Sequence, residues 1–303
     1  MNRPASPARP GPLVAWLQAA RPKTLPVAVV PVIVGSAVAY ASTGRFAADV
    51  LFVALLVALL IQVGTNLHND AADTEKGADD PATRLGPARA SAEGWLPAGR
   101  VKRVSMALFA IAFFSGLYLC TIGGWPIFVL GVTCILAGMA YSGGPWPVAY
   151  SCIGELFVWL FFGLAAVGGT YYLQVGGQLH GVALLAGAAI GLPAAAILVV
   201  NNTRDIDADR AAGRRTFPVL FGPRAAGLEY ALLMLGAFAV VGWLSLSVGA
   251  WALIALGVLP WAIGLVRRFL GASGGEDYNS LLADTARFQV GFGLLLSAGL
   301  VAA

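Results

Sequence analysis

The chain alternates long apolar runs with shorter polar stretches over almost its whole length. Each run approaches the roughly 20 residues that a helix needs to cross a lipid bilayer. The runs cover approximately residues 25–42, 47–69, 104–122, 126–141, 150–173, 181–202, 225–246, 249–266 and 286–303. The pattern therefore predicts an all-α polytopic membrane protein with about nine transmembrane helices.

Three connections between these runs carry specific expectations. The link from Gly123 to Pro126 is so short that the third and fourth helices should form an antiparallel pair. Residues 74–103 make the longest polar stretch, and a loop of this length between membrane helices is expected to act as a lid over a site. Residues 277–284 are expected to form a polar connector before the last helix.

Composition agrees with this pattern and excludes a soluble domain. Hydrophobic residues make up 58% of the 303 residues and charged residues only 11%, with a mean hydropathy of +0.79. We expect a single integral-membrane domain over residues 1–303, in which residues 1–12 form a flexible N-terminal tail. This tail does not have the pattern of a cleavable signal peptide.

The distribution of Lys and Arg predicts the orientation. All but one of the 19 Lys and Arg residues fall in stretches on the same side of the predicted helices, and Arg45 is the exception. Under the positive-inside rule, the N-terminus and the long loop lie in the cytoplasm and the protein is held in the inner, cytoplasmic membrane of the cell. The net charge of +4 is thus a topology signal. We expect the lipid bilayer as a partner, no nucleic acid and no obligate protein partner.

Two of the apolar runs end in dense groups of amides and carboxylates. If the second run continues as a helix, Asn66, Asn69, Asp70 and Asp73 fall at i, i+3, i+4 and i+7 and form one polar stripe. After the sixth run, Asn201, Asp205 and Asp209 fall at i, i+4 and i+8. One stripe alone is more simply explained as a helix cap or a solvated helix end. Two stripes with basic residues beside both favour one shared site.

Carboxylates that lie so close together repel one another unless a cation sits between them. Carboxylate and amide oxygens suit Mg²⁺, which usually completes its octahedron with water and substrate phosphate. The stripes therefore look like a magnesium-diphosphate clamp that holds about two ions. The metal ligands expected are Asn69, Asp70, Asp73, Asp205 and Asp209.

Further candidates carry two interpretations each. Glu155 is the only acidic residue that we place well inside an apolar run, so it is either a functional group for the acceptor substrate or a protonated helix-packing group. Tyr141 either belongs to the aromatic belt of the membrane or contacts substrate. Arg21 and Lys23 either anchor the chain at the interface or bind diphosphate.

The residues around both stripes give the chain a family resemblance. They are Asn69-Asp70-Ala71-Ala72-Asp73 with Gly77 and Asp79, Asn201-Asn202-Thr203-Arg204-Asp205-Ile206-Asp207-Ala208-Asp209, and Gly213-Arg214-Arg215-Thr216. Supporting stretches are Arg21–Pro26, Arg84–Pro87, Tyr141–Pro145, Gly154–Phe157 and Thr285–Arg287. With these motifs, nearly the whole chain after about residue 12 resembles the UbiA-type intramembrane aromatic prenyltransferases. More narrowly, it is similar to the menaquinone branch, the 1,4-dihydroxy-2-naphthoate polyprenyltransferases.

The resemblance implies a fold, a reaction and a set of site residues. The fold would be nine helices around a central cavity. The reaction would transfer a polyprenyl group from polyprenyl diphosphate to the aromatic acid with Mg²⁺, release CO₂ and diphosphate, and give demethylmenaquinone. The family motif NxxxDxxxD falls on Asn69 and Asp73, and the second motif DxxxD on Asp205 and Asp209. Gly77 departs from the third position of the first motif, where Asp70 or Asp79 could supply the missing oxygen.

The candidate residues implied in this way fall into two groups. The catalytic candidates are Asn69, Asp70, Asp73, Glu155, Asp205 and Asp209. The substrate-binding candidates are Arg21, Lys23, Lys76, Arg84, Tyr141, Asn201, Asn202, Arg204, Arg214 and Arg215. Motifs that bind diphosphate do not determine which aromatic ring is bound, so 4-hydroxybenzoate or homogentisate remains an alternative acceptor. A secondary transporter is the alternative from another class of protein, although its charges are typically found near mid-membrane.

Overall fold

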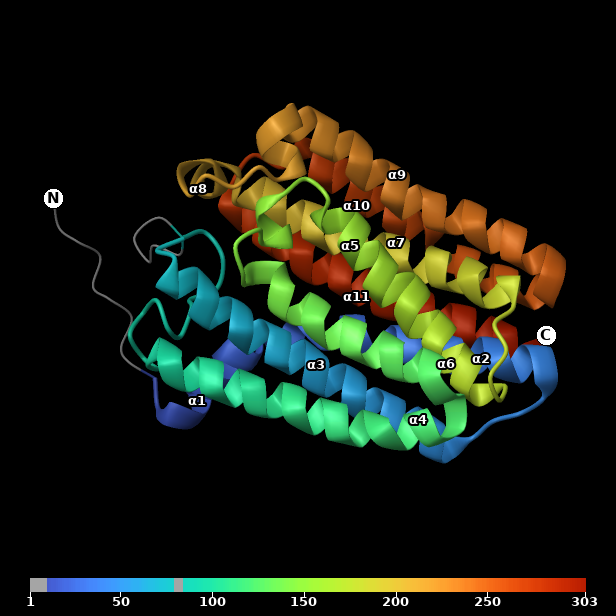
Figure 1. The fold of residues 1–303 in the computed structure, drawn as a ribbon. Coiled ribbons are helices and arrows are strands. Elements are labelled where there is room, and N and C mark those ends of the chain that lie inside the picture. The colour runs from blue at the N-terminus through green and yellow to red at the C-terminus, as the bar shows by residue number, and fades with distance from the viewer. Residues whose placement is uncertain (1–9, 79–83) are drawn as a thin grey trace, which may run out of the picture.

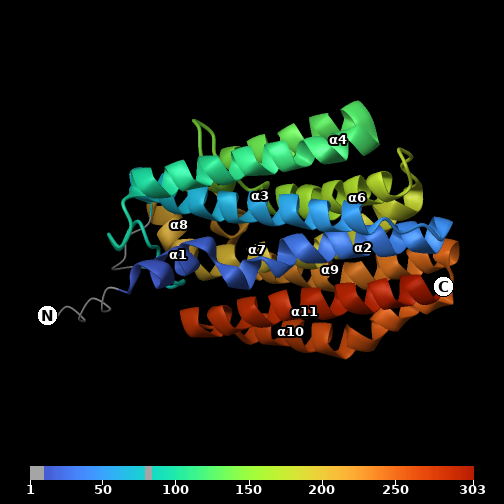
Figure 2. The same ribbon diagram turned by 90° about the horizontal axis from the view of Figure 1, so that it is seen from below.

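The computed structural model describes residues 10–78 and 84–303, and within these ranges the chain is helical without any strand. The elements are α1 (Pro12–Ala20), η1 (Pro22–Thr24), α2 (Pro26–Thr43), α3 (Ala48–Glu75), α4 (Ala98–Ser142), η2 (Val148–Tyr150), α5 (Gly154–Val158), the π-helix η3 (Trp159–Ala165), α6 (Ala166–Gln174), α7 (Gly181–Arg204), α8 (Ile206–Ala211), α9 (Phe217–Val248), η4 (Ala250–Val258), α10 (Leu259–Gly271) and α11 (Gly275–Ala302). The long helices run along a common axis and form one bundle (Figures 1 and 2).

The described residues include eight helical segments that are long and apolar enough to cross a membrane, and one of these is folded back on itself. In α4, Gly124 has a non-helical backbone with φ 65°. In a straight helix, Phe113 and Phe128 would lie about 22 Å apart. Their rings instead lie 6.1 Å apart, because the two arms of α4 run side by side (Figure 1). The predicted antiparallel pair is confirmed, and if its two arms are counted separately the described residues contain about nine apolar helical passes, close to the expected number.

Two details of the predicted segments are wrong. The connector expected at residues 277–284 is part of α11, which already begins at Gly275. Glu276 and Asp277 lie in its first turn, where carboxylates interact favourably with the helix dipole, so a polar sequence extends the helix beyond its apolar part. Glu155 is also not the only acidic residue inside an apolar span, because α9 contains the half-buried Glu229.

Close helix contacts place α7 at the centre of the bundle. Gly163 of η3 and Gly187 of α7 approach so closely that a Cβ on Gly163 would lie 2.6 Å from the carbonyl oxygen of Gly187. Small residues allow such backbone contact between membrane helices. As a result, α7 packs against η3, α9 and α11, and its last residues lie at the same end of the bundle as the end of α3 and the short helix α8 (Figure 1).

Candidate active site

A cavity of about 1430 Å³ enters the bundle at the end where α3, α7 and α8 terminate. Its deeper wall is apolar and includes Val32, Leu119 and Leu173. Its polar end is lined by members of both stripes, Asn66, Asn69, Asp73, Asn201, Asp205 and Asp209. The structure therefore brings the two stripes to one cavity, although they are separated by more than a hundred residues of sequence.

Asp73 and Asp209 occupy equivalent positions at two helix ends. α3 and α8 each end in a glycine with left-handed backbone, Gly77 with φ 65° and Gly213 with φ 73°. Around each glycine, two backbone N–H groups donate to carbonyl oxygens of the preceding helix. After α3, Ala78 donates to Asp73 and Gly77 donates to Thr74. After α8, Arg214 donates to Asp209 and Gly213 donates to Arg210. This is the Schellman arrangement. Gly77 thus departs from the family motif because the helix stops there, and Asp79 lies outside the described residues.

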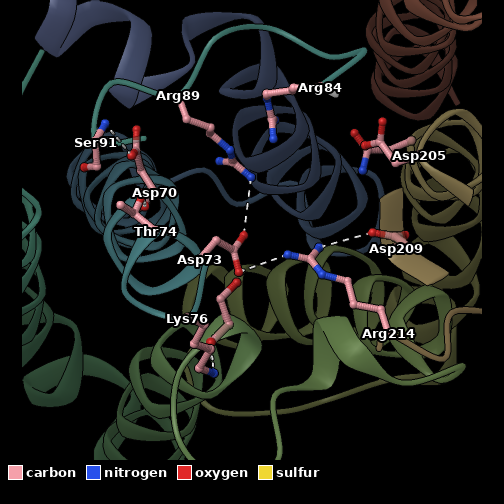
Figure 3. A network of polar contacts seen from close by, with 12 residues as sticks. Asp70, Asp73, Thr74, Lys76, Arg84, Arg89, Ser91, Asp205, Asp209 and Arg214 are labelled. Carbon is pink, nitrogen blue, oxygen red and sulfur yellow. Dashed lines mark hydrogen bonds and ion pairs between the residues drawn. The ribbon is translucent and has the colours of Figure 1, made fainter. Parts of the chain in front are cut away.

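Arg214 joins the two helix ends electrostatically. One of its terminal nitrogens lies 3.1 Å from Asp73 Oδ1, and the other lies 3.5 Å from Asp209 Oδ1 (Figure 3). Its guanidinium group also lies over the ring of Tyr150, 4.7 Å from the ring centre. Because Asp73 and Asp209 are buried and the Arg214 side chain is only 15% exposed, their charges interact more strongly than on an exposed surface.

Asp205 lies between α7 and α8 and is held by its neighbour Arg204. The guanidinium group donates to both carboxylate oxygens of Asp205, at 2.8 and 2.6 Å. It also donates to Asn201 Oδ1 at 2.9 Å and to Asn279 Oδ1 of α11 at 3.0 Å. Arg204 is buried, so this cluster fixes the direction of the Asp205 carboxylate at the wall of the cavity.

Residues 84–97, in the described part of the loop between α3 and α4, are attached to the helices by hydrogen bonds at two places. Asp70 accepts the backbone N–H groups of Ala90 and Ser91, at 3.1 and 2.9 Å (Figure 3). Asn279 donates to the carbonyl oxygen of Leu85 at 2.8 Å. Both oxygens of Asp70 are therefore engaged with the loop, and it does not line the cavity as Asp73 does.

This loop brings two arginines to the acidic helix ends. Arg89 lies 3.5 Å from Asp73 Oδ2. Arg84, whose Nε donates to the carbonyl oxygen of Pro87 at 2.6 Å, projects into the space between Asp73 and Asp205 (Figure 3). Gly86 lies directly on the guanidinium group of Arg204, since a Cβ there would approach it to 2.6 Å. The loop thus adds positive charge to the mouth of the cavity.

The remaining predicted residues lie at different depths of the site. Arg21 and Lys23 line the cavity, and Arg21 has the only positive φ, 52°, among the described residues other than glycine. Lys76 donates to the carbonyl oxygens of Ser142 and Gly144, at 2.8 and 3.3 Å, and lies outside the cavity wall. The exposed Arg215 contributes only its backbone N–H, which donates to Tyr150 at 2.9 Å.

An aromatic wall and a buried acid form the membrane-facing side of the site. The rings of Tyr141 and Phe157 lie 5.8 Å apart, and those of Phe157 and Phe161 lie 4.5 Å apart, along the cavity. Glu155 is buried and accepts a hydrogen bond of 2.7 Å from Asn202 Nδ2. Asn202 lines the cavity, whereas Glu155 does not.

The donor set at the polar end fits a hard divalent cation. The buried Asn69 Oδ1 has no hydrogen-bond partner within the described residues. Burial raises the pKa of Asp209 to about 7, against the opposing effect of Arg214, so this carboxylate would gain from a nearby cation. In residues 10–78 and 84–303, no three His, Cys, Asp or Glu side chains form a metal cage by themselves. Mg²⁺ is commonly held by one or two carboxylates together with substrate phosphate, and Asp73, Asp205 and Asp209 offer carboxylates at this end of the cavity.

Three site residues were not predicted from the sequence. Arg89 belongs to the same polar stretch as Arg84 and could have been included on that ground. Tyr150, which underlies Arg214, and Asn279, which contacts Arg204 and the loop, carry no signal in the sequence that marks them.

The cavity thus combines an apolar interior with acidic and basic groups at one end, a lining that suits a ligand with a long apolar chain and an anionic head. The model of the UbiA prenyltransferase family matches residues 28–284, and the chain therefore belongs to this family. It is an aromatic prenyltransferase, as its relatives indicate.

Curated relatives match over most of the chain. The 1,4-dihydroxy-2-naphthoate octaprenyltransferase of Escherichia coli (strain K12) is 36% identical over 228 residues, which are 73% of this chain and 73% of that protein. The protein of the same name from Mycobacterium tuberculosis is 32% identical over 289 residues, 94% of this chain and 96% of that one.

Solved structures share the fold at low sequence identity. An apo UbiA homologue from Aeropyrum pernix K1 has a TM-score of 0.71 and 17% identity, covering 93% of this chain and 98% of that one. A UbiA homologue from Archaeoglobus fulgidus bound to DMAPP and Mg²⁺ has a TM-score of 0.62 and 17% identity, covering 93% of this chain and 99% of that one.

Proposed function

We propose that the protein transfers a polyprenyl group from polyprenyl diphosphate to 1,4-dihydroxy-2-naphthoate in a Mg²⁺-dependent reaction that releases diphosphate and CO₂ and gives demethylmenaquinol, the two-electron-reduced form of demethylmenaquinone. The observation that carries this proposal is the convergence of two acidic helix ends and several arginines at one end of an apolar cavity. The names of the curated relatives support the naphthoate acceptor.

The polar end is assigned to the diphosphate. Arg84, Arg89 and Arg214 would bind phosphate oxygens, and Arg204 would keep Asp205 in position. Asn69, Asp73, Asp205 and Asp209 would hold the Mg²⁺ ions, of which we expect two. When bound, the metal neutralises charge that develops on the leaving diphosphate. The solved homologue with DMAPP and Mg²⁺ supports this assignment.

The apolar part of the cavity is assigned to the prenyl chain and the ring. When the allylic C–O bond breaks, its electron pair leaves with the diphosphate. The ring carbon that bears the carboxylate then bonds to the allylic carbon, the C–COO⁻ bond returns its electron pair to the ring, and CO₂ departs. Apolar side chains such as Val32, Leu119 and Leu173 keep water from the carbocation.

The orientation in the membrane follows from the same proposal. The basic residues of the site, including Arg84, Arg204 and Arg214, lie at one end of the bundle, and the exposed Arg45 lies in the connection between α2 and α3 at the other (Figure 1). We assign the end with the site to the cytoplasmic face of the inner membrane.

A product assay tests the function. The purified protein is incubated with farnesyl diphosphate, Mg²⁺ and one of three acceptors, namely 1,4-dihydroxy-2-naphthoate, 4-hydroxybenzoate or homogentisate, and products are identified by mass spectrometry. We expect a prenylated, decarboxylated naphthalene product. If only 4-hydroxybenzoate or only homogentisate is prenylated, that compound and not the naphthoate is the acceptor. Absence of any prenylated aromatic product would overturn the proposal.

A further inference from the structure

Glu155 and Asn202 form a buried pair whose purpose the proposed function leaves open. Glu155 belongs to α5 and is only 5% exposed, without a place on the cavity wall. Its Oε1 accepts the hydrogen bond of 2.7 Å from Asn202 Nδ2. Glu155 lies in the first turn of α5, and a buried acidic side chain is costly unless it has a hydrogen-bonding partner. Here the partner is an amide that does face the cavity.

The hydrogen bond fixes the orientation of the Asn202 amide. In this structure the NH₂ group of Asn202 faces Glu155 and donates to its carboxyl oxygen, which is the acceptor of the pair. The amide oxygen is turned elsewhere, and it has no hydrogen-bond partner within the described part of the chain. The preceding residue differs, because Asn201 Oδ1 accepts from Arg204 at the diphosphate end. Asn202 alone of the two thus keeps an unused acceptor at the cavity wall.

The cavity that Asn202 lines also has a wall suited to a flat aromatic ligand. Tyr141, Phe157 and Phe161 form a continuous row of rings along the same cavity. Leu198, one turn before Asn202 on α7, also lines it. Aromatic faces and an aliphatic side chain favour contact with another ring. A single acceptor atom in such an apolar wall would be left unpaired by any ligand that has no hydrogen to donate there.

We propose that the amide oxygen of Asn202 accepts a hydrogen bond from a ring hydroxyl group of the aromatic acceptor, and that Glu155 is the positioning residue that holds the amide for this contact. The proposal rests on the proposed function and specifies how the acceptor is chosen. A hydroxylated ring satisfies the amide oxygen. A methyl ether at the same position leaves it unpaired, and a carboxylate there adds repulsion between two acceptors.

Inhibition by matched ring analogues tests the proposal without relying on turnover of the analogue. The probes are 1,4-dihydroxy-2-naphthoate as substrate and a pair of competitive inhibitors, a hydroxynaphthoate and its O-methyl ether. In the wild type we expect the hydroxyl compound to bind at least tenfold more tightly. In Asn202→Leu and Asn202→Ser this preference should fall to about twofold or less, while the KM for farnesyl diphosphate stays within twofold of the wild type.

Glu155→Gln tests the positioning role. A Gln side chain can donate as well as accept, so the Asn202 amide is no longer held in one orientation. We expect a reduced preference for the hydroxyl compound and a raised KM for the naphthoate, with kcat at saturating naphthoate retained. If Glu155 only packs helices together, the melting temperature changes and the preference does not, and that result would overturn its positioning role.

Gln174→Leu is the matched control for the loss of a buried amide. Gln174 hydrogen-bonds to Ser36 and to the backbone of Ala47, away from the cavity. Its replacement should lower the melting temperature and leave the ring preference unchanged. An unchanged preference in both active Asn202 variants would overturn the inference and leave the proposed function standing. A wild type that prenylates no aromatic acid would instead overturn the proposed function.

Discussion

Arg214 is the side chain that holds the two acidic helix ends together. Its ion pairs with Asp73 and Asp209 span residues that belong to different halves of the sequence. The ring of Tyr150 packs against the guanidinium group and limits the directions in which this group can point. In the proposed reaction the same group would face the leaving diphosphate, where a planar guanidinium can bind two oxygens at once.

Replacing Arg214 with Gln should weaken the binding of prenyl diphosphate. Charge-assisted hydrogen bonds of this kind contribute about 1.5–3 kcal/mol, which corresponds to roughly a ten- to hundredfold increase in KM. Steady-state kinetics with varied farnesyl diphosphate measures the change. Arg210→Gln is the control, because the Arg210 side chain is 59% exposed and forms an ion pair with Asp207 on the surface. Equal KM values for both variants would contradict the role of Arg214.

The helix ends at Gly77 and Gly213 are elements with a shared construction. Each glycine lies four residues after the carboxylate that faces the cavity, Asp73 or Asp209. Its left-handed backbone turns the chain, and in the second case the next residue is Arg214. The end of α8 thereby sets the positions of the Asp209 carboxylate and of the Arg214 guanidinium group within six residues.

Gly213→Ala should disturb this construction. A residue with a Cβ costs about 1–2 kcal/mol in the left-handed region, so the variant should be less stable and should have a raised KM for farnesyl diphosphate. Thermal unfolding in detergent and kinetics measure both effects. Gly242→Ala in α9 is the control, since an added Cβ there meets nothing within 4 Å, the backbone is helical and the residue does not line the cavity. If the two variants behave alike, the left-handed turn does not matter for the site.

The loop over the cavity depends on Asp70. In Asp70→Ala, the N–H groups of Ala90 and Ser91 lose their acceptor, and each buried group left unpaired costs about 1–3 kcal/mol. Hydrogen exchange of residues 84–96 should therefore become faster than in the wild type. Glu75 lies on the same helix as Asp70, and Glu75→Ala, which removes its exposed ion pair with Lys102 of α4, should leave the exchange unchanged. Unchanged exchange in Asp70→Ala would show that the loop is held by other contacts.

The sequence predicts the elements well where the cause is local. Apolar runs of membrane length and the Gly123 to Pro126 turn define the helices, and the spacing of Asn69, Asp73, Asp205 and Asp209 defines the polar faces. The orientation of the Asp70 side chain and the close contact of Gly86 with Arg204 depend on how distant segments pack together. An example is the hydrogen bond from Asn279 to the carbonyl oxygen of Leu85, which joins residues 194 positions apart. Helix periodicity carries no information about such contacts.

At the scale of the whole molecule, the site lies at one end of the bundle and the apolar cavity extends from it between the helices. Ala88 in the loop and Ala212 after α8 both line the cavity, whereas the exposed Thr43 lies at the far end of α2 (Figure 1). This arrangement lets a head group reach water at the site while the chain remains in the apolar interior.

Cysteine labelling tests the orientation of the bundle. In a background with Cys120, Cys134 and Cys152 replaced, single cysteines at positions 88 and 212 should react with a membrane-impermeant reagent only from the cytoplasm. A cysteine at position 43 should react only from the outside. Labelling of positions 88 and 212 from opposite sides would contradict the common site.

The central claim is that two acidic helix ends form one diphosphate site, and ligand binding to a double mutant tests it most directly. The dissociation constant of a thio-linked farnesyl diphosphate analogue is measured with Mg²⁺ for Asp73→Ala, Asp209→Ala and the double variant. Asp207→Ala is the control, since its side chain is 91% exposed. We predict that each single variant weakens binding at least tenfold and that the double variant loses little more, because the carboxylates act on the same ligand. Independent, additive losses, or equal affinity in the wild type with and without Mg²⁺, would contradict the account.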